Sequence, residues 1–172
     1  MRTGYRDTDI TVLNAVFEPP PHEKVPFLMK TLIDWVNNSS LKPIRKTCAF
    51  HLLFEVIHPF VDGNGRTGRI LMNYLLIKEG LVNVGFDKPQ EYIQALKKTE
   101  KPAIWIVEKL IRGRKLKPED IDLYFEEHSP REFENLVRKR PETGTSITEP
   151  GTIGVVTGAE TTRKRGNSGR SL

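Results

Sequence analysis

The segment HPFVDGNGRTGR, residues 58–69, decides how the rest of this chain is interpreted. It sets three glycines, one asparagine, one aspartate and two arginines behind a histidine, a composition that neither a helix interior nor a strand favours. Glycines allow a ligand to approach the backbone closely, and arginines present rigid pairs of N–H donors. The segment therefore predicts a loop that binds an anionic ligand beside a histidine.

The glycines and arginines of the segment have the spacing of a phosphate site. Gly63 and Gly65 would open backbone N–H groups to an anion. A helix that begins around Arg66–Gly68 would direct its positive end and its free N–H groups into the same space. Arg66 and Arg69 lie three positions apart on that first turn, so we expect both to bind phosphate oxygens.

The other polar residues of the segment suit a reaction at phosphate. Asp62 is its one carboxylate and is placed to hold a Mg²⁺ that bridges phosphates. Asn64 can donate to a phosphate oxygen through its amide. His58, whose ordinary pKa is about 6.5, is a natural general base for an incoming nucleophile. Phe60 is expected to point inward and to attach the loop to the core.

Helical periodicity surrounds this loop on both sides. Apolar residues recur at helical spacing over residues 25–36, and an Asn-Asn-Ser-Ser run then ends the pattern. Pro43 opens a second helix. Pro59 should end that helix close to His58, because the residue before a proline disfavours helical geometry. Further helices are predicted over residues 66–80, 89–98, 102–112 and 118–127.

Both ends of the chain depart from this helical pattern. Residues 5–18 alternate loosely and carry Thr, Val, Ile and Phe before three prolines, which predicts an extended strand or hairpin. After residue 137 the apolar periodicity fades, and residues 138–172 are rich in Gly, Thr and Ser. We therefore expect an all-α domain over residues 1–137 with a short β-hairpin near its start, followed by a flexible tail over residues 138–172.

Charge and cysteine content exclude several classes of protein. Of the net charge of +5, residues 138–172 contribute seven Lys/Arg and three Glu, or +4, and the other 137 residues contribute 20 basic and 19 acidic side chains, or +1. A nearly neutral domain lacks the charge pattern of a nucleic-acid-binding protein. The apolar runs are too short to span a bilayer, and no signal peptide is evident. With Cys48 as its single cysteine, we expect a cytoplasmic protein without disulfides.

Two other interpretations of the segment compete with a phosphate site. GNGRTG, residues 63–68, matches the dinucleotide-binding pattern G-x-G-x-x-G, with LLFEVI at 52–57 as a preceding strand and Asp87 as a later acid. However, five residues separate that strand from the first glycine and no repeated βαβ pattern follows, which argues against it. The second is a polar turn between two helices whose arginines pair with carboxylates.

The segment resembles the signature of the Fic family, His-x-Phe-x-Asp/Glu-Gly-Asn-Gly-Arg-x-x-Arg, and it meets every fixed position. Other segments resemble the family in the family's order: GYR at 4–6, FEPPP at 17–21, VPFLMKTLIDWVN at 25–37, AFHLLFEVIHPF at 49–60 and EYIQAL at 91–96. The resemblance covers roughly residues 4–112 and implies a mainly helical Fic-type core.

The usual activity of that family is the transfer of AMP from ATP to a hydroxyl side chain of a target protein. The resemblance therefore implies that His58 deprotonates a Ser, Thr or Tyr of the target and that Asp62 binds Mg²⁺. It also implies that Asn64 and the nearby backbone hold the α-phosphate, while Arg66 and Arg69 hold the β- and γ-phosphates. The nucleotide-binding residues would be Asp62, Gly63, Asn64, Gly65, Arg66, Thr67, Gly68, Arg69 and, near the base, Tyr92.

The resemblance extends to target binding and to regulation. Four residues, Asn14, Ala15, Val16 and Phe17, resemble the flap on which relatives dock a target segment by strand-like pairing. The sequence shows no convincing copy of the family's inhibitory motif. Any inhibition would therefore come from a separate chain or segment.

Some positions differ from the family pattern and leave two other functions open. Ile93 and Glu100 stand where relatives often have an aromatic residue and an asparagine. The chain could transfer a different phosphate-containing group, although Gly63 and Gly65 argue against the branch of the family that has Ala-Asn-Lys in place of Gly-Asn-Gly. It could also be a non-catalytic module that binds a nucleotide or a protein. His51 is expected to pack and hydrogen-bond rather than to catalyse.

Overall fold

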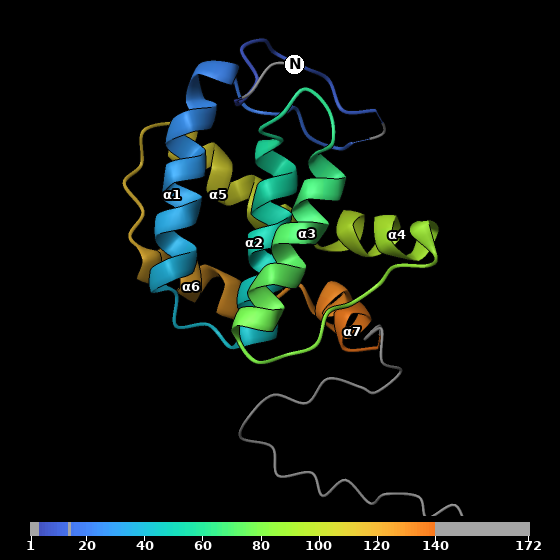
Figure 1. The fold of residues 1–172 in the computed structure, drawn as a ribbon. Coiled ribbons are helices and arrows are strands. Elements are labelled where there is room, and N and C mark those ends of the chain that lie inside the picture. Colours follow the sequence, from blue (N-terminus) through green and yellow to red (C-terminus); the bar gives the residue numbers. More distant parts are fainter. Residues whose placement is uncertain (1–3, 14, 140–172) are drawn as a thin grey trace, which may run out of the picture.

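The computed structural model of the chain describes residues 4–13 and 15–139, and the statements below concern those residues. A short 3₁₀ turn, η1 (His22–Lys24), precedes seven α-helices (Figure 1). These are α1 (Val25–Asn38), α2 (Pro43–Ile57), α3 (Asn64–Lys78), α4 (Pro89–Thr99), α5 (Lys101–Ile111), α6 (Pro118–Glu127) and α7 (Arg131–Lys139). The described part of the chain contains no strand, so its fold is helical, as the apolar spacing predicts.

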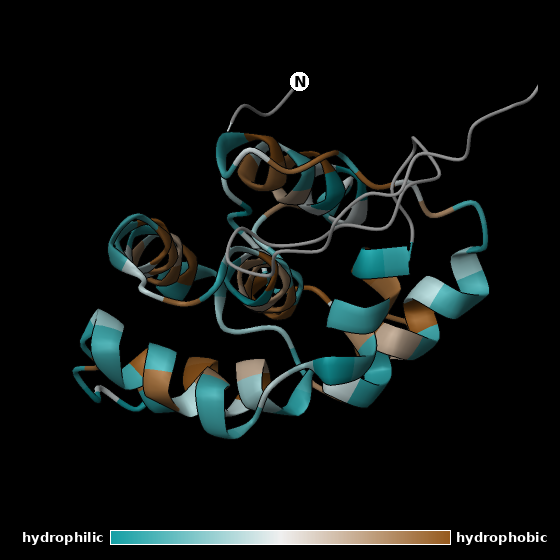
Figure 2. Ribbon diagram, turned by 90° about the horizontal axis from the view of Figure 1, so that it is seen from below, coloured by the Kyte–Doolittle hydropathy of each residue, from teal (hydrophilic) through white to brown (hydrophobic). Residues whose placement is uncertain are grey.

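Helix α2 lies at the centre of the fold and packs against α1, α3, α5 and α7 (Figure 1). Its side chains are buried on all sides, and Cys48 is among them. The surrounding helices carry hydrophilic residues on their outward faces (Figure 2), as expected for helices with one apolar face toward a core. His58, at the end of α2, is therefore carried by the most completely enclosed helix.

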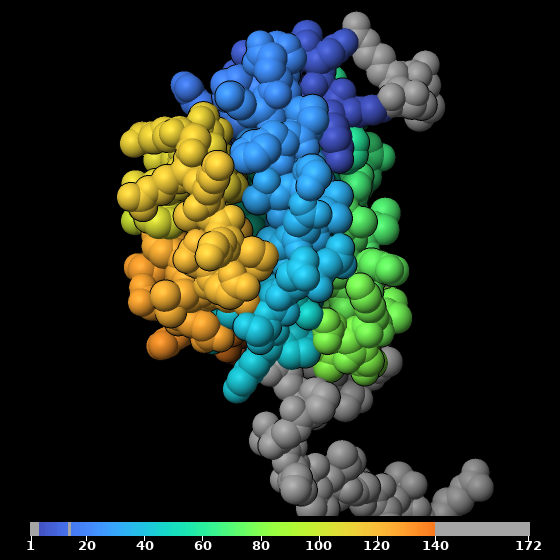
Figure 3. All heavy atoms as spheres, turned by 90° about the vertical axis from the view of Figure 1, so that its left-hand side faces the viewer, coloured from blue at the N-terminus to red at the C-terminus, as the bar shows by residue number. Residues whose placement is uncertain are grey.

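Helix α1 covers one side of α2. Its Trp35 is buried, and the indole Nε1 donates to Asp122 Oδ1 at 2.8 Å, which ties α1 to α6. Figure 3 shows α1 running across this face of the molecule, with α5 and α6 on one side and α3 on the other. Trp35 is a core anchor. Trp105 is only half-buried, and its ring stacks 4.0 Å from that of Tyr124.

Three boundaries differ from the prediction. Helix α3 begins at Asn64 rather than around residue 66, because Gly63 adopts a left-handed φ of 83° and starts the helix at once. Helix α7, of nine residues, was not predicted, although its apolar residues Phe133, Leu136 and Val137 recur at helical spacing. Arg138 and Lys139, expected in the tail, end α7. The remainder of the expected tail lies outside the described residues.

The hairpin predicted for residues 5–18 is not formed in the described part of that segment, and Asn14 lies outside it. The backbone N–H of Arg6 donates to the carbonyl of Pro59 at 2.8 Å instead of to a neighbouring strand. Within the segment, the N–H of Ala15 closes a turn on the carbonyl of Val12 at 3.3 Å. Residues 4–13 and 15–21 thus form an irregular N-terminal strap that lies beside the α2–α3 loop (Figure 1).

This architecture decides one of the alternative interpretations of the segment at 58–69. Residues 52–57, the candidate strand of a dinucleotide-binding fold, lie inside α2, so that interpretation is wrong. Of the helices in the described ranges, none is both long enough and apolar enough to cross a bilayer.

Candidate active site

His58 ends helix α2 in a left-handed conformation, with φ of 50° and ψ of 62°. Its backbone N–H donates to the carbonyl of Phe54 at 2.9 Å, which closes the last turn of the helix. Histidine adopts this conformation more readily than bulkier residues. The chain leaves the helix sharply at this residue, as Pro59 predicts.

The imidazole of His58 is oriented by its own helix. Its Nδ1 lies 3.1 Å from the carbonyl oxygen of Glu55. A carbonyl only accepts hydrogen bonds, so Nδ1 carries the proton and Nε2 keeps a free lone pair. Burial lowers the pKa of His58, the Glu55 carbonyl acts in the opposite direction, and the charge of Arg6 lowers the pKa further. The ring is therefore neutral at neutral pH and can accept a proton at Nε2.

Asn64 closes the loop between α2 and α3. Its Oδ1 accepts the N–H of Phe60 at 2.9 Å, and its Nδ2 donates to the carbonyl of Phe60 at 2.8 Å. The residue is 2% exposed. The ring of Phe60 packs between those of Tyr5 and Phe54 and attaches the loop to the core, as predicted. The side chain of Asn64 thus shapes the loop from inside, and its contact with a phosphate stays a prediction.

The start of α3 leaves backbone donors available for an anion. The first hydrogen bond of this helix runs from the N–H of Thr67 to the carbonyl of Gly63 at 2.9 Å. The N–H groups of the residues before Thr67 therefore have no acceptor within the helix. A Cβ on Gly65 would lie only 3.4 Å from Nη1 of Arg69, so that guanidinium lies close to the Gly65 backbone. This combination of free N–H groups and a cation suits a phosphate.

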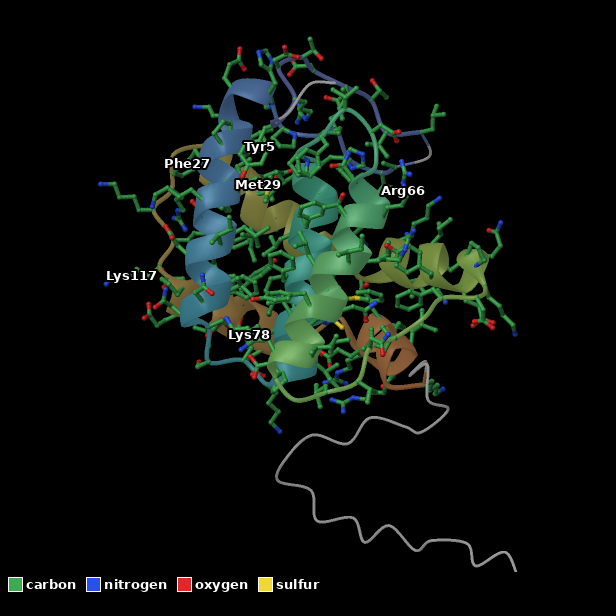
Figure 4. The ribbon with its side chains drawn as sticks, viewed as in Figure 1. Tyr5, Phe27, Met29, Arg66, Lys78 and Lys117 are labelled. Carbon is green, nitrogen blue, oxygen red and sulfur yellow. The ribbon has the colours of Figure 1, made fainter. Side chains whose placement is uncertain are left out.

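The two arginines of the loop have different surroundings. Arg66 extends from the N-terminal end of α3 (Figure 4) with 74% of its side chain exposed, and its Nη2 lies 3.4 Å from Asp62 Oδ2. Arg69 is half-buried, with its guanidinium 5.4 Å from the centre of the Tyr92 ring. The structure thus brings Asp62 and Arg66 together at the tip of the loop and places Arg69 deeper.

Behind Arg69 lies a buried polar cluster from α2, α3 and α4. Nε2 of His51 is 2.7 Å from the hydroxyl of Tyr92 and 3.7 Å from Oε1 of Glu55. A Cβ on Gly68 would lie 2.6 Å from Glu55 Oε1 and 2.9 Å from Cε1 of His51. Gly68 therefore allows α3 to approach α2 closely, and its contact with a nucleotide stays a prediction. His51 packs and hydrogen-bonds, as predicted.

Burial shifts the protonation of this cluster toward neutral forms. It raises the pKa of Glu55 to about 7, although the charge of Arg69 opposes the shift. It lowers the pKa of His51 to about 4, and it raises the pKa of Tyr92. Oε1 of Glu55 and Nδ1 of His51 have no hydrogen-bond partner among the described residues. The cluster is therefore poor in charge, and Arg69 is its one permanent cation.

A cavity of about 450 Å³ opens beside His58. Residues of the strap, among them Ala15 and Phe17, form one wall, and α4 up to Glu100 forms the other. Val16, which is exposed, is not part of the lining. Glu100 is 7% exposed, burial raises its pKa, and its Oε1 lacks a partner within the described ranges. The structure thus brings part of the expected flap and one face of α4 to the candidate base.

Asp62 is the candidate metal ligand. Its side chain is 89% exposed, and Oδ1 accepts the N–H of Gly63 at 2.6 Å. The described residues contain no group of three or more His, Cys, Asp or Glu side chains that could hold a metal alone. Mg²⁺ in nucleotide sites commonly uses one or two carboxylates together with substrate phosphates and water. One accessible carboxylate beside free N–H groups fits that pattern.

Two residues of the site were not singled out from the sequence. Glu55 lies three positions before His58 on the same helix, a spacing that could have indicated it. Arg6 donates from Nε to the carbonyl of His58 at 2.9 Å, across 52 positions of sequence. That contact depends on how the strap crosses the loop, and nothing in local periodicity reveals it.

A family model described as the Fic/DOC family matches residues 2–76. An Aquifex aeolicus protein named a probable protein adenylyltransferase is 50% identical over 114 residues, which cover 66% of this chain and 36% of that protein. The protein adenylyltransferase Fic of Drosophila willistoni is 33% identical over 134 residues, which cover 75% of this chain and 27% of that protein. This chain thus spans about a third of these relatives or less.

A solved structure agrees with the sequence comparisons. The crystal structure of a Fic-domain-containing signalling protein from Bacteroides thetaiotaomicron matches with a TM-score of 0.53 and 26% identity, over 86% of this chain and 58% of that one. Together with the twelve-residue segment at 58–69, these matches show that this chain belongs to the Fic/DOC family.

Proposed function

We propose that this chain is a protein adenylyltransferase, which transfers AMP from ATP to a Ser, Thr or Tyr hydroxyl of a target protein. The observation that carries the proposal is the position of His58. A neutral imidazole with a free Nε2 lies at one end of a loop whose other end offers free helix N–H groups and two arginines. The names of the relatives support the same activity.

In the proposed reaction, Nε2 of His58 accepts the proton of the target hydroxyl. The hydroxyl oxygen then forms a bond to the α-phosphorus, and the bond from that phosphorus to the bridging oxygen of pyrophosphate breaks. Pyrophosphate leaves with the electron pair, and Arg66 and Arg69 hold its charge. Asp62 would hold Mg²⁺, which neutralises phosphate charge when bound.

The cavity beside His58 is the proposed place for the nucleoside. It meets the segment at 58–69 at His58 and has apolar walls from the strap and from Ile93 and Leu96 of α4. The target segment would run along Ala15, Val16 and Phe17, where Val16 is exposed for contact. Asn14, the first residue of the expected flap, lies outside the described residues.

The test is incubation of the purified chain, alone and with cell lysate, with Mg²⁺ and ATP labelled on the α-phosphate. We expect label and an added AMP mass on protein. His58→Ala should lower the rate by at least about 10²-fold, because a positioned general base contributes that much. His128→Ala is the matched control, since His128 is exposed at the end of α6 and stacks on Tyr124.

Three results would contradict the proposal. Label that persists in His58→Ala would show that His58 is not the base. Protein labelling in a parallel reaction with ATP labelled on the γ-phosphate, and none with the α-label, would indicate transfer of a different phosphate-containing group. ATP binding without transfer to any protein would indicate a non-catalytic nucleotide-binding module.

A further inference from the structure

A buried arginine, Arg6, joins the N-terminal strap to the backbone at His58. Arg6 is 4% exposed, and its Nε donates to the carbonyl of His58 at 2.9 Å. Nη1 donates to the carbonyl of Thr8 at 3.1 Å, and Nη2 donates to that of Pro20. The backbone N–H of Arg6 donates to the carbonyl of Pro59 at 2.8 Å. One residue thus fastens both His58 and Pro59 to the strap.

The backbone of His58 needs such a restraint. In residues 4–13 and 15–139, His58 is the only non-glycine residue with a positive φ, which is 50°. A side-chain-bearing residue keeps that conformation only where its surroundings enforce it. Phe54 holds the N–H of His58 from the helix side, and Arg6 holds its carbonyl from the strap side. These two bonds set the direction in which the imidazole leaves the backbone.

We propose that Arg6 is a positioning residue for His58, which it holds in the left-handed turn that presents the imidazole to the cavity. The inference rests on the proposed function, in which His58 is the general base. Arginine suits this task because its planar fork meets several acceptors at once, whereas lysine has the charge without the fork.

The charge of Arg6 has a second effect on His58. With burial, it lowers the pKa of the imidazole. The other charged groups near His58 are Glu55, one turn earlier on α2, and Lys97 and Glu100, which line the same cavity. Asp9 lies 3.7 Å from Arg6 and is exposed. Replacing Arg6 by a neutral residue should therefore move the titration of His58 to higher pH, whereas lysine should leave it in place.

The experiment compares Arg6→Lys and Arg6→Gln with Arg45→Lys and Arg45→Gln. Arg45 is the matched control, because it is a partly buried arginine near the other end of α2 that pairs with Glu126 and, at 2.8 Å, with Glu134. Each variant is measured by urea unfolding, by NMR titration of the His58 imidazole, and by AMP transfer between about pH 5 and pH 8.

We expect Arg6→Lys to lower kcat by about 10- to 100-fold, as a misplaced catalytic group does, with KM for ATP changed by no more than about two-fold. The acid limb of its kcat–pH profile, where activity falls as His58 becomes protonated, should stay at the same pH. Arg6→Gln should lose a similar factor in kcat, and its acid limb should move to higher pH. Both Arg45 variants should lose stability but keep the kcat and pH profile of the unmodified chain.

The inference is overturned if Arg6→Lys keeps its kcat and the NMR signals of His58 do not change. It is also overturned if the Arg45 variants lose kcat in the same proportion. If the unmodified chain transfers no AMP, the proposed function fails. NMR of the free protein then tests separately whether Arg6 positions the imidazole of His58. Changed His58 signals in Arg6→Lys then support it, and unchanged signals in both Arg6 variants overturn it.

A surface variant covers the case in which Arg6→Gln does not fold. Asp9→Asn removes the exposed carboxylate beside Arg6 and leaves the fork in place. The charge of Arg6 is then less compensated, so the titration midpoint of His58 should fall. A midpoint that stays the same in Asp9→Asn, together with unchanged His58 signals in Arg6→Lys, would overturn the inference.

Discussion

The segment at 58–69, which comprises the α2–α3 loop and the first turns of α3, has two parts with opposite surroundings. Its rim, Asp62 and Arg66, is open to solvent, with side chains that are 89% and 74% exposed. Its base, Asn64 and Gly68, is buried against Phe60 and against His51 and Glu55 of α2. This contrast indicates that the base holds the loop and α3 against α2, whereas the rim is accessible to a ligand. Substitutions in the base should therefore change stability, and substitutions in the rim should change ligand binding.

The largest loss of stability is expected for Asn64→Ala. The variant removes both bonds to Phe60 and leaves a partly buried N–H and C=O without partners. Each unsatisfied group costs about 1–3 kcal/mol, so the free energy of unfolding should fall by about 2–4 kcal/mol in urea denaturation. Asn64→Asp keeps the acceptor and loses the donor, so it should lose about half as much. A loss in Asn64→Ala as small as that of a surface variant would show that the base is not held by Asn64.

Glu55→Gln should stabilise the protein at alkaline pH. The pKa of Glu55 is about 7 in the folded protein, against 4.5 for an ordinary glutamate. The unfolded chain therefore loses this proton first, and stability falls as pH rises from 4.5 to about 7. Gln carries no proton to lose. At about pH 8 the free energy of unfolding of the variant should therefore be about 2–3 kcal/mol larger than that of the unmodified chain.

The gain in Glu55→Gln should shrink as the pH falls toward about 4, where both states hold the proton. Glu127→Gln, a substitution of an exposed residue at the end of α6, is the control for the removal of a carboxylate elsewhere. A gain that is the same at every pH would contradict a raised pKa for Glu55.

Two glycines of the loop should respond in opposite ways to alanine. Gly68→Ala would place a Cβ 2.6 Å from Glu55 Oε1 and 2.9 Å from the His51 ring, and overpacking of this kind costs about 1–2 kcal/mol. Gly65→Ala meets only Arg69 Nη1 at 3.4 Å, and alanine favours the helix by up to about 1 kcal/mol. Thermal unfolding of both variants measures the contrast. Equal effects on stability would show that the base does not constrain Gly68.

The smallest effect on stability is expected in the rim. Asp62→Asn removes an exposed carboxylate and its 3.4 Å contact with Arg66, and exposed pairs contribute at most about 1 kcal/mol. The free energy of unfolding should therefore change by less than about 0.5 kcal/mol. Calorimetric titration with Mg²⁺ and ATP should show weaker binding if Asp62 holds the metal. A large loss of stability would place Asp62 in the base and not in the rim.

The helices were largely predictable because their signals are local. Pro43 and Pro59 mark the two ends of α2, since proline restricts the backbone next to it whatever the tertiary fold. The predicted hairpin is wrong for the described residues of this segment, and loose alternation could not reveal this, because the strap bonds to the loop in place of a partner strand. The short helix α7 was missed because a helix of this length is not stable by itself. The burial of Phe133 and Val137 against other elements stabilises it.

The residue types of the candidate site were predictable, and their orientations were not. The sequence places a histidine, an aspartate, an asparagine and two arginines within one short loop. It does not show that Asn64 turns inward to Phe60, or that Gly68 is needed where α3 meets α2. Both facts depend on contacts between elements. From the sequence alone, the same residue types could equally well contact a ligand.

The sequence by itself determined a helical fold, a loop between two helices, and a histidine at the end of the first. It did so because periodicity, proline and glycine act within a few residues. Only the tertiary structure decided that Arg6 reaches His58 across 52 positions and that Glu55, His51 and Tyr92 lie behind Arg69. Those contacts form where separate elements pack, because a buried polar group is stabilised when a group from another part of the chain becomes its partner.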